Sequence, residues 1–324
     1  MLNVVELLQR DVTSLGSASP SPEVCQRALG HAHGVAALFA VIKQRPLYVA
    51  HDISAKVLDM AIQLLKRAGD HDVAVGGAEV EVAWVCISSL MTLGPNFVRG
   101  HLPQLLVLWR NALPKPTSKD ININSGRSTA EWSFLLQLRE AALSAILSFL
   151  EHNSPILITL DVARRLNSLL ANALAFANAF IEVRVHDGPE EPLNPTGEPT
   201  LTTREAALRR RIYQCFTALG FSSISEATQS SLLQSAVSLF ASSEGYAGSF
   251  VQAAIATSSG NFSTIWRVTD GYAYGLTGGA WPSHSSQDYL VLEGVEDTKG
   301  NDHFEIALEQ LACDFIIVSP VYPC

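Results

Sequence analysis

The fold class can be inferred from one apolar segment, which reads Val80-Glu-Val-Ala-Trp-Val-Cys-Ile-Ser-Ser-Leu-Met-Thr-Leu-Gly-Pro-Asn-Phe-Val-Arg-Gly-His-Leu-Pro-Gln-Leu-Leu-Val-Leu-Trp-Arg-Asn-Ala-Leu113. Its first part predicts a helix at about 78–93 that is apolar on nearly every side. A Gly94-Pro95 corner follows, and a second apolar helix is predicted at about 102–113. A helix that is apolar all round must be covered on several sides by other helices. The segment therefore predicts a protein of stacked helices.

The composition is that of a folded chain with a large core. Of its 324 residues, 48% are apolar and only 16% are charged, and the net charge is −9. About 25% charged residues is usual for a globular protein, so we expect this chain to bury much surface against itself or against partners. The acidic balance argues against a nucleic-acid-binding protein, which needs a clustered basic face.

The apolar runs are too short for a membrane span by inspection, because none reaches the roughly 18 uncharged residues required. The first ten residues lack the basic start and the long apolar region of a signal peptide. The five cysteines are widely spaced, odd in number and never arranged as Cys-x-x-Cys, which indicates reduced thiols. We therefore expect a cytoplasmic protein without a transmembrane segment.

Several unusual side chains are predicted to be buried. Trp84 and Trp109 are predicted core residues. Arg139 falls within an apolar stripe, so its charge should be paired or should extend to the edge of the core. Three cysteines lie in helical patterns beside other apolar residues and are expected in the interior: Cys25, Cys86 and Cys215.

Apolar residues recur at the helical period through the first three quarters of the chain. Eight helices are predicted, at approximately 22–43, 53–68, 78–93, 102–113, 129–152, 160–182, 203–220 and 229–242. We expect them to pair as antiparallel hairpins that begin near residues 22, 78, 129 and 203. Their spacing of roughly 50–75 residues exceeds the ~40–47 residues of a HEAT repeat, and loops would absorb the excess. The predicted fold class is all-α, an α-solenoid of the HEAT or armadillo type.

Three regions follow one another along the chain. Residues 1–20 are predicted to form a partial helix and a linker, and residues 21–243 the helical repeats. Residues 244–324 form an irregular, partly helical segment rich in glycine, serine and aromatic residues. An open solenoid needs a polar final face, which residues 315–324 do not resemble. We therefore expect an internal piece of a longer protein, or a shortened gene product, with apolar surface exposed at both ends.

Motifs for catalysis or cofactor binding are missing from the sequence. It contains no Gly-x-x-x-x-Gly-Lys-Ser/Thr loop, no Gly-x-Gly-x-x-Gly after a strand and no Gly-x-Ser-x-Gly. Glu190 and Glu191 lie in a proline-rich loop, which cannot hold two carboxylates at catalytic precision. Glu79 and Glu81 are expected on different sides of their helix. The sequence therefore predicts a protein that is not an enzyme and has no catalytic residue or cofactor.

Two histidine-containing clusters are candidate metal sites. His31 and His33 are two apart in a predicted helix, where they point to different faces and cannot easily share one ion. Asp70, His71 and Asp72 are all metal-ligand types, but no fourth ligand stands at a recognisable spacing. A solvated turn between helices explains this cluster equally well, and no metal site is expected. A helical enzyme or metal-binding protein that uses Asp70 and His71 is the alternative of another class.

Positive charge is concentrated at one place, Arg204 with Arg209, Arg210 and Arg211. The simplest interpretation is a solvated helix face opposite the apolar stripe of the same helix. The sharper interpretation is a binding site for an acidic partner or for an anionic membrane surface.

Two blocks in the opening segment carry a resemblance to a known family: Ser89-Leu-Met-Thr-Leu-Gly-Pro-Asn-Phe-Val98 and His101-Leu-Pro-Gln-Leu-Leu-Val-Leu-Trp-Arg-Asn-Ala-Leu-Pro114. They resemble the HEAT-repeat-containing protein five family, which includes the large accessory protein of the type-one clathrin adaptor. Weaker similarity lies at 140–147 and 249–260. The Met-Thr-Leu-Gly-Pro block followed by Leu-Leu-x-Leu-Trp-Arg-Asn is more specific than generic leucine patterning.

The resemblance implies a cytosolic solenoid scaffold with no known active site. Its expected partners are the type-one clathrin adaptor complex and its accessory proteins. Its expected location is peripheral, on the trans-Golgi network, endosomes and clathrin-coated vesicles. Binding would use a concave helix surface or the loops at 114–128 and 183–202. The alternative within the same class is another HEAT or armadillo scaffold, such as a transport receptor or a regulatory subunit.

Overall fold

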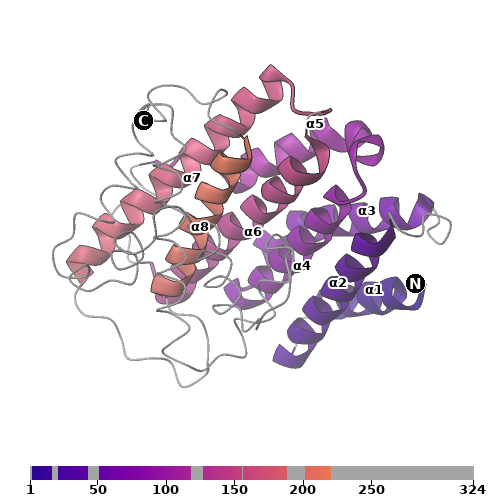
Figure 1. Cartoon of the computed structure of the whole chain (residues 1–324). Coiled ribbons are helices and arrows are strands. Elements are labelled where there is room, and N and C mark those ends of the chain that lie inside the picture. The colour runs from indigo at the N-terminus through magenta and orange to yellow at the C-terminus, as the bar shows by residue number, and fades with distance from the viewer. Residues whose placement is uncertain are drawn as a thin grey trace, which may run out of the picture. The chain divides into compact units, whose positions relative to one another are not determined.

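The computed structural model describes residues 2–16, 21–42, 51–117, 127–154, 156–187 and 201–219 (Figure 1). All regular secondary structure in these ranges is helical, which confirms the all-α prediction. The chain divides into two compact units, residues 1–113 with 127–159 and residues 114–126 with 160–324. The predicted helix at 229–242 and the predicted irregular segment at 244–324 lie outside the described residues.

The described part of the first unit contains six α-helices and one 3₁₀ helix. They are α1 (Leu2–Leu15), α2 (Pro22–Ile42), α3 (His51–Arg67), η2 (Ala68–Asp70), α4 (Val73–Met91), α5 (Pro95–Ala112) and α6 (Thr129–Asn153). The partial helix expected within residues 1–20 corresponds to α1, which has 14 residues.

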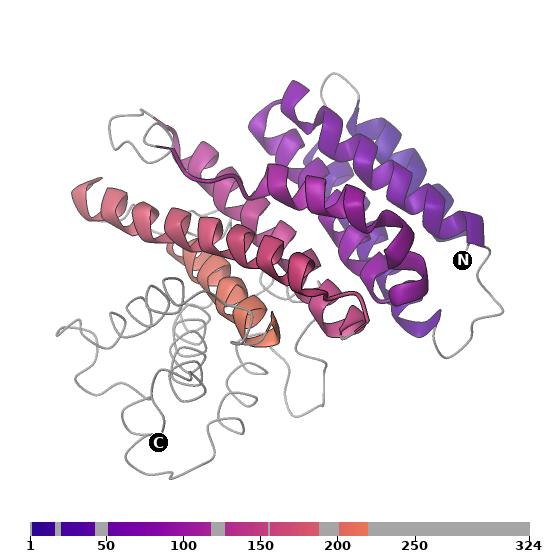
Figure 2. The same ribbon diagram turned by 90° about the horizontal axis from the view of Figure 1, so that it is seen from above.

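The helices of the first unit pack in a repeated pattern. α1 packs on α2, α3 on α4 and α5 on α6, while α2, α4 and α6 stack on one another in that order (Figure 2, from above). The predicted hairpins, which began near residues 22 and 78, are therefore wrong by one helix. The cause is α1, whose apolar stripe gives α2 a partner earlier in the chain than the predicted pairing allowed.

α4 is the central helix of this unit. It packs against α2, α3 and α6, and every residue from Val75 to Met91 except Ala78 is buried. Trp84 is almost completely enclosed, which confirms it as a core residue. The prediction that this apolar helix must be covered on several sides is therefore confirmed.

α4 begins earlier than the apolar pattern predicts. Asp72 is its N-cap residue, and the carboxylate accepts a hydrogen bond of 2.8 Å from the backbone N–H of Val75. Gly76 allows the preceding turn to fold back, because a Cβ there would lie 2.5 Å from the carbonyl oxygen of Ala68. This close approach brings η2 and His71 against the first turns of α4.

The predicted Gly94-Pro95 corner is confirmed. Gly94 has φ 88° and is the N-cap of α5, and Pro95 occupies the first turn, where its missing N–H costs nothing. The predicted start of this helix at about residue 102 is wrong, because α5 begins at Pro95 and has Pro103 in its interior. Pro103 is exposed, so solvent can take the place of the helix hydrogen bond that a proline removes.

α6 matches its predicted range, and it is held to the neighbouring helices by polar and aromatic contacts. Ser128 and Glu131 form a capping box at its start. The hydroxyl of Ser148 donates to the carbonyl of Ser88 on α4 at 2.9 Å. The ring of Phe149 lies 5.5 Å from the ring of Trp109 on α5, which confirms Trp109 as core.

Arg139 is buried in α6, as its place in the apolar stripe predicts. One of its Nη atoms donates to the carbonyl of Leu135 at 2.9 Å. The expected partner for this charge is thus supplied in part by the helix's own backbone.

α4 and α6 also have the length and composition of a membrane-spanning helix. Most of each helix is buried inside the unit, and the core helix of a soluble protein meets the same criteria. The apolar surface of α4 packs against α2, α3 and α6, and that of α6 packs against α4 and α5.

In the described part of the second unit, α7 (Leu160–Asp187) packs against α8 (Leu201–Leu219). Both agree with predicted helices. The apolar stripe of α7 is buried, and its members include Val162, Leu166, Leu169, Ala173, Phe176 and Phe180.

Candidate functional site

Two carboxylates in the first unit are completely enclosed, Asp11 on α1 and Glu79 on α4, each with a side chain 0% exposed. A buried charge is stable only when it is paired and hydrogen-bonded. Both carboxylates meet this requirement in the same way, by accepting one hydrogen bond from an arginine Nε and one from a histidine Nδ1.

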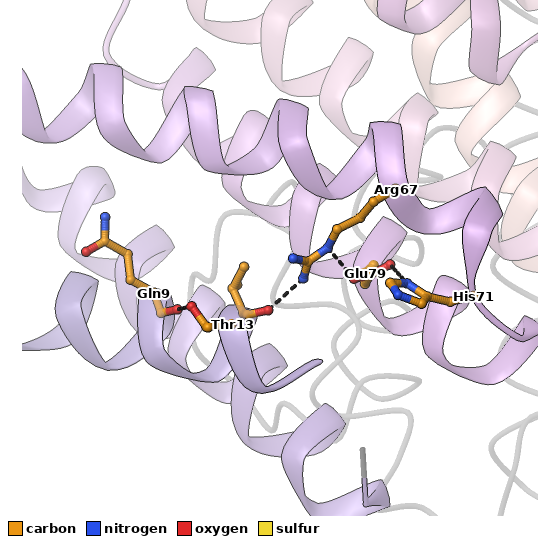
Figure 3. Close-up of polar contacts among 6 residues, drawn as sticks. Gln9, Thr13, Arg67, His71 and Glu79 are labelled. Carbon is orange, nitrogen blue, oxygen red and sulfur yellow. Dashed lines mark hydrogen bonds and ion pairs between the residues drawn. The ribbon is translucent and has the colours of Figure 1, made fainter. Parts of the chain in front are cut away.

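Glu79 is bound from two sides (Figure 3). Arg67, the last residue of α3, places its Nε 2.5 Å from Oε1, and His71 places its Nδ1 2.8 Å from Oε2. The same guanidinium donates through Nη2 to the carbonyl of Val12 at 2.6 Å, near the C-terminus of α1. The Glu79 network therefore joins α1, α3, α4 and the turn before α4.

Asp11 forms the corresponding network between α1 and α2. Its two carboxylate oxygens lie 2.9 Å from Nε of Arg27 and 2.6 Å from Nδ1 of His31. Both donors come from α2 and are one helical turn apart, so they meet one acceptor on the facing helix. Sequence reasoning missed this network, because Asp11 and its partners are at least 16 residues apart.

The Glu79 network resembles one component of a catalytic site. A carboxylate that holds a histidine through Nδ1 also orients the general base of a Ser-His-Asp triad. A candidate nucleophile is the thiol of Cys25, which is affected by the charge of Glu79. Burial and the charges of Asp72 and Glu79 raise the pKa of this thiol. A raised pKa keeps the thiol protonated and unreactive. The hydrogen bonds of Glu79 and Arg67 connect the ends of neighbouring helices, and we interpret the network as a structural contact.

The Asp70, His71 and Asp72 cluster does not converge on one point. Asp72 caps α4, His71 is bound to Glu79, and Asp70 is exposed in η2. Among the described residues no group of three His, Cys, Asp or Glu side chains is placed to hold a metal ion. The structure supports the interpretation of these residues as an inter-helix turn.

His31 and His33 point to different faces of α2, as predicted. His31 is bound to Asp11, whereas His33 is only 5% exposed and neither of its ring nitrogens has a hydrogen-bond partner in the described part of the chain. Burial lowers the pKa of His33 to about 4, because the charged imidazolium would lose its hydration.

The predicted partner-binding arginines lie on α8. Arg209, Arg210 and Arg211 are only 2%, 2% and 4% exposed, so their interpretation as a solvated face is wrong. Arg204 is half-buried. Nothing in this placement supports binding of a partner by the three buried guanidinium groups.

The buried guanidinium group of Arg209 is compensated by hydrogen bonds to neighbouring side chains. Its Nε donates to Glu205 at 2.8 Å and its Nη1 donates to Asn178 of α7 at 3.0 Å. Burial alone would lower the pKa of Arg209, but Glu205 and Tyr213 outweigh it and raise the pKa. The sequence contained a signal for this pairing, because Glu205 precedes Arg209 by one helical turn.

Of the three cysteines predicted to be buried, Cys86 and Cys215 are buried and Cys25 is half-buried. All three are free thiols. The remaining two cysteines, Cys313 and Cys324, lie outside the described residues.

The described residues form helices as their only regular secondary structure, and buried polar groups in the first unit join these helices to one another. No protein-family model matches the chain, and no solved structure matches it.

Proposed function

We propose that this chain is a non-enzymatic helical-repeat scaffold of the α-solenoid type. The observation that supports the proposal is the packing of the first unit, in which one two-helix arrangement occurs three times. α2, α4 and α6 stack as a row, and α1, α3 and α5 each pack on one member of that row. In a solenoid each repeat likewise contacts its neighbours in sequence, and the stacked helices form a continuous core.

The cellular role that we propose is vesicle-mediated transport between the trans-Golgi network and endosomes. Its support is the resemblance of residues 89–98 and 101–114 to the clathrin-adaptor accessory family. In the structure these blocks form the end of α4, the Gly94 corner and most of α5. The proposed partners are the type-one clathrin adaptor complex and its accessory proteins, through which the chain would associate peripherally with membranes.

Affinity capture with the purified full chain tests this role. The chain is immobilised and incubated with purified type-one clathrin adaptor complex, with an unrelated adaptor complex as the control. Saturable retention of the type-one complex is the expected result. Equal retention of both complexes, or of neither, contradicts the vesicle-transport role.

Another HEAT or armadillo scaffold is the alternative function within the same class. A nuclear transport receptor would retain transport cargo, and a regulatory subunit would retain a kinase or phosphatase catalytic subunit. Mass spectrometry of proteins retained from cytosol, quantified against beads without the chain, separates these outcomes from enrichment of adaptor subunits.

A further inference from the structure

The outward face of α5 carries a continuous exposed stripe, which we call the α5 stripe: Asn96, Arg99, Pro103, Val107 and Arg110. These residues follow one another at intervals of three or four, so they share one side of the helix. All five are exposed, and the apolar side chain of Val107 is 56% exposed. The stripe therefore combines two cations with an apolar centre.

The opposite side of α5 is attached to its unit by few residues. Only Val98, Leu105, Trp109 and Ala112 are buried, and α6 is the helix on which α5 chiefly packs. The α5 stripe lies on the side that these contacts leave uncovered. Binding of an amphipathic partner helix through side chains spaced by three or four residues is a recurring mode of peptide recognition.

The charge of the α5 stripe contrasts with that of the chain. The chain has a net charge of −9, yet no aspartate or glutamate occurs between Glu81 and Asp120. Arg99 and Arg110 form no ion pair with any residue that the structure describes. Both guanidinium groups are therefore available to carboxylates from outside the described chain.

The spacing of the two arginines sets the size of the partner. They are eleven residues apart in one helix, which corresponds to about 16 Å at 1.5 Å per residue. A second helix laid along α5 places carboxylates at the same separation when they are also eleven residues apart. An apolar side chain between them then faces Pro103 and Val107.

We propose that the α5 stripe binds an acidic helical peptide of a partner protein, with two acidic positions about three turns apart and leucine between them. This names the partner chemistry of the proposed scaffold and rests on that function. The stripe supplies two opposite charges for orientation and one apolar patch for affinity.

Two other occupants fit the α5 stripe less well. A second copy of the chain, joined through a two-fold interface, would place the α5 arginines of one copy against those of the other, and like charges repel. An anionic membrane surface is typically bound by clusters of four to eight basic residues, whereas this stripe offers two.

The test measures binding of fluorescein-labelled peptides to the purified full chain by fluorescence anisotropy at about physiological ionic strength. The panel consists of 20-residue helical peptides with two acidic residues eleven positions apart and one, two or three leucines between them. A matched panel has glutamine in place of every acidic residue. We expect saturable binding of at least one acidic peptide and at least about tenfold weaker binding of its glutamine counterpart.

Variants locate the binding site on the chain. The double variant R99E/R110E should weaken binding at least about tenfold, and V107Q about threefold, because each removes one part of the stripe. The control variant R10E/K66E makes the same change in net charge at exposed positions of α1 and α3 and should stay within about twofold of the parent. Circular dichroism and urea midpoints establish that all variants are folded.

Four results overturn the proposal: no acidic peptide binds saturably, the glutamine peptides bind equally well, R10E/K66E weakens binding as much as R99E/R110E, or R99E/R110E leaves binding unchanged. Phosphatidylserine vesicles and sedimentation of the chain alone are measured in parallel. Loss of vesicle binding or of self-association in R99E/R110E, without peptide binding, assigns the surface to a membrane or to a second copy. If peptide binding is retained and the adaptor complex is not captured, the vesicle-transport role fails and the peptide site stands.

Discussion

Buried carboxylates decide how the helix ends of the first unit meet. Glu79 accepts hydrogen bonds from α3 and from the turn before α4, and Arg67 extends the contact to α1. Removing two charges from water costs several kcal/mol each, so such a network is no guarantee of net stability. It does constrain geometry, because Arg67 and His71 must both reach the carboxylate of Glu79 while Arg67 also reaches the carbonyl of Val12.

Replacing Glu79 by glutamine should destabilise the protein by about 3 kcal/mol, because Arg67 would lose its opposite charge in a largely buried place. Urea unfolding followed by circular dichroism measures this change. The matched control is Asp52→Asn, which breaks the exposed pair with Lys56 and should cost less than about 0.5 kcal/mol. Equal losses in both variants would show that the buried network has no special role.

His33 should make stability depend on pH. Its pKa is about 4 in the folded chain, whereas the ordinary histidine value of 6.5 applies after unfolding. Between these pH values the unfolded state binds more protons, so acid favours unfolding. The contribution of His33 is complete above pH 6.5 and is lost as the pH falls toward 4.

Comparing the parent protein with the variant His33→Leu separates the contribution of His33 to the pH dependence of stability from that of the other histidines. Between pH 7 and pH 5 the parent protein should lose about 2 kcal/mol more than the variant. At pH 7 the variant should be about as stable as the parent, since neutral His33 is already buried without a hydrogen-bond partner among the described residues. Parallel stability curves for the two proteins would refute the assignment.

At the scale of elements, the corner between α4 and α5 depends on one backbone conformation. Gly94 has φ 88° and ψ −175°, a combination that side-chain-bearing residues avoid. It is the only residue with a positive φ in the described part of the chain. The direction in which α5 leaves α4 therefore depends on glycine at this position.

Gly94→Ala should cost about 2 kcal/mol through backbone strain, although an added Cβ meets no atom within 4 Å. Gly100→Ala is the matched change within α5, where the site is also open and the backbone is helical. It should stabilise the protein by about 0.5–1 kcal/mol. Urea midpoints that move in the same direction for both variants would contradict this explanation.

At the scale of the whole molecule, protection should be uneven across the first unit. α4 is enclosed by α2, α3 and α6, whereas α5 buries four side chains and contains Pro103. Amide exchange followed by mass spectrometry should therefore be at least about tenfold slower in the centre of α4 than in the first half of α5. Equal rates would indicate that the unit opens as a single block.

The sequence predicted most of the helices but not their neighbours. Apolar periodicity located α6, α7 and α8 closely, and the all-round apolar character of α4 predicted its enclosure. The predicted starts of α4 and α5 are wrong, because the N-cap residue Asp72 and the first helical residue Pro95 lie outside the apolar patterns by which these helices are located. The predicted hairpin pairing is wrong, because α1 packs on α2 and thereby shifts the pairing by one helix.

What the sequence determined by itself is therefore local: helix formation, the Gly94 corner and the burial of Trp84 and Trp109, all of which follow from spacing along one chain segment. Only the tertiary structure decided which helices pack together, which donors enclose Asp11 and Glu79, and that Arg209 to Arg211 face inward. The physical reason is that these outcomes depend on groups brought together from different helices, such as Arg67, Val12 and Glu79. Periodicity within one helix contains no information about a partner more than 50 residues away.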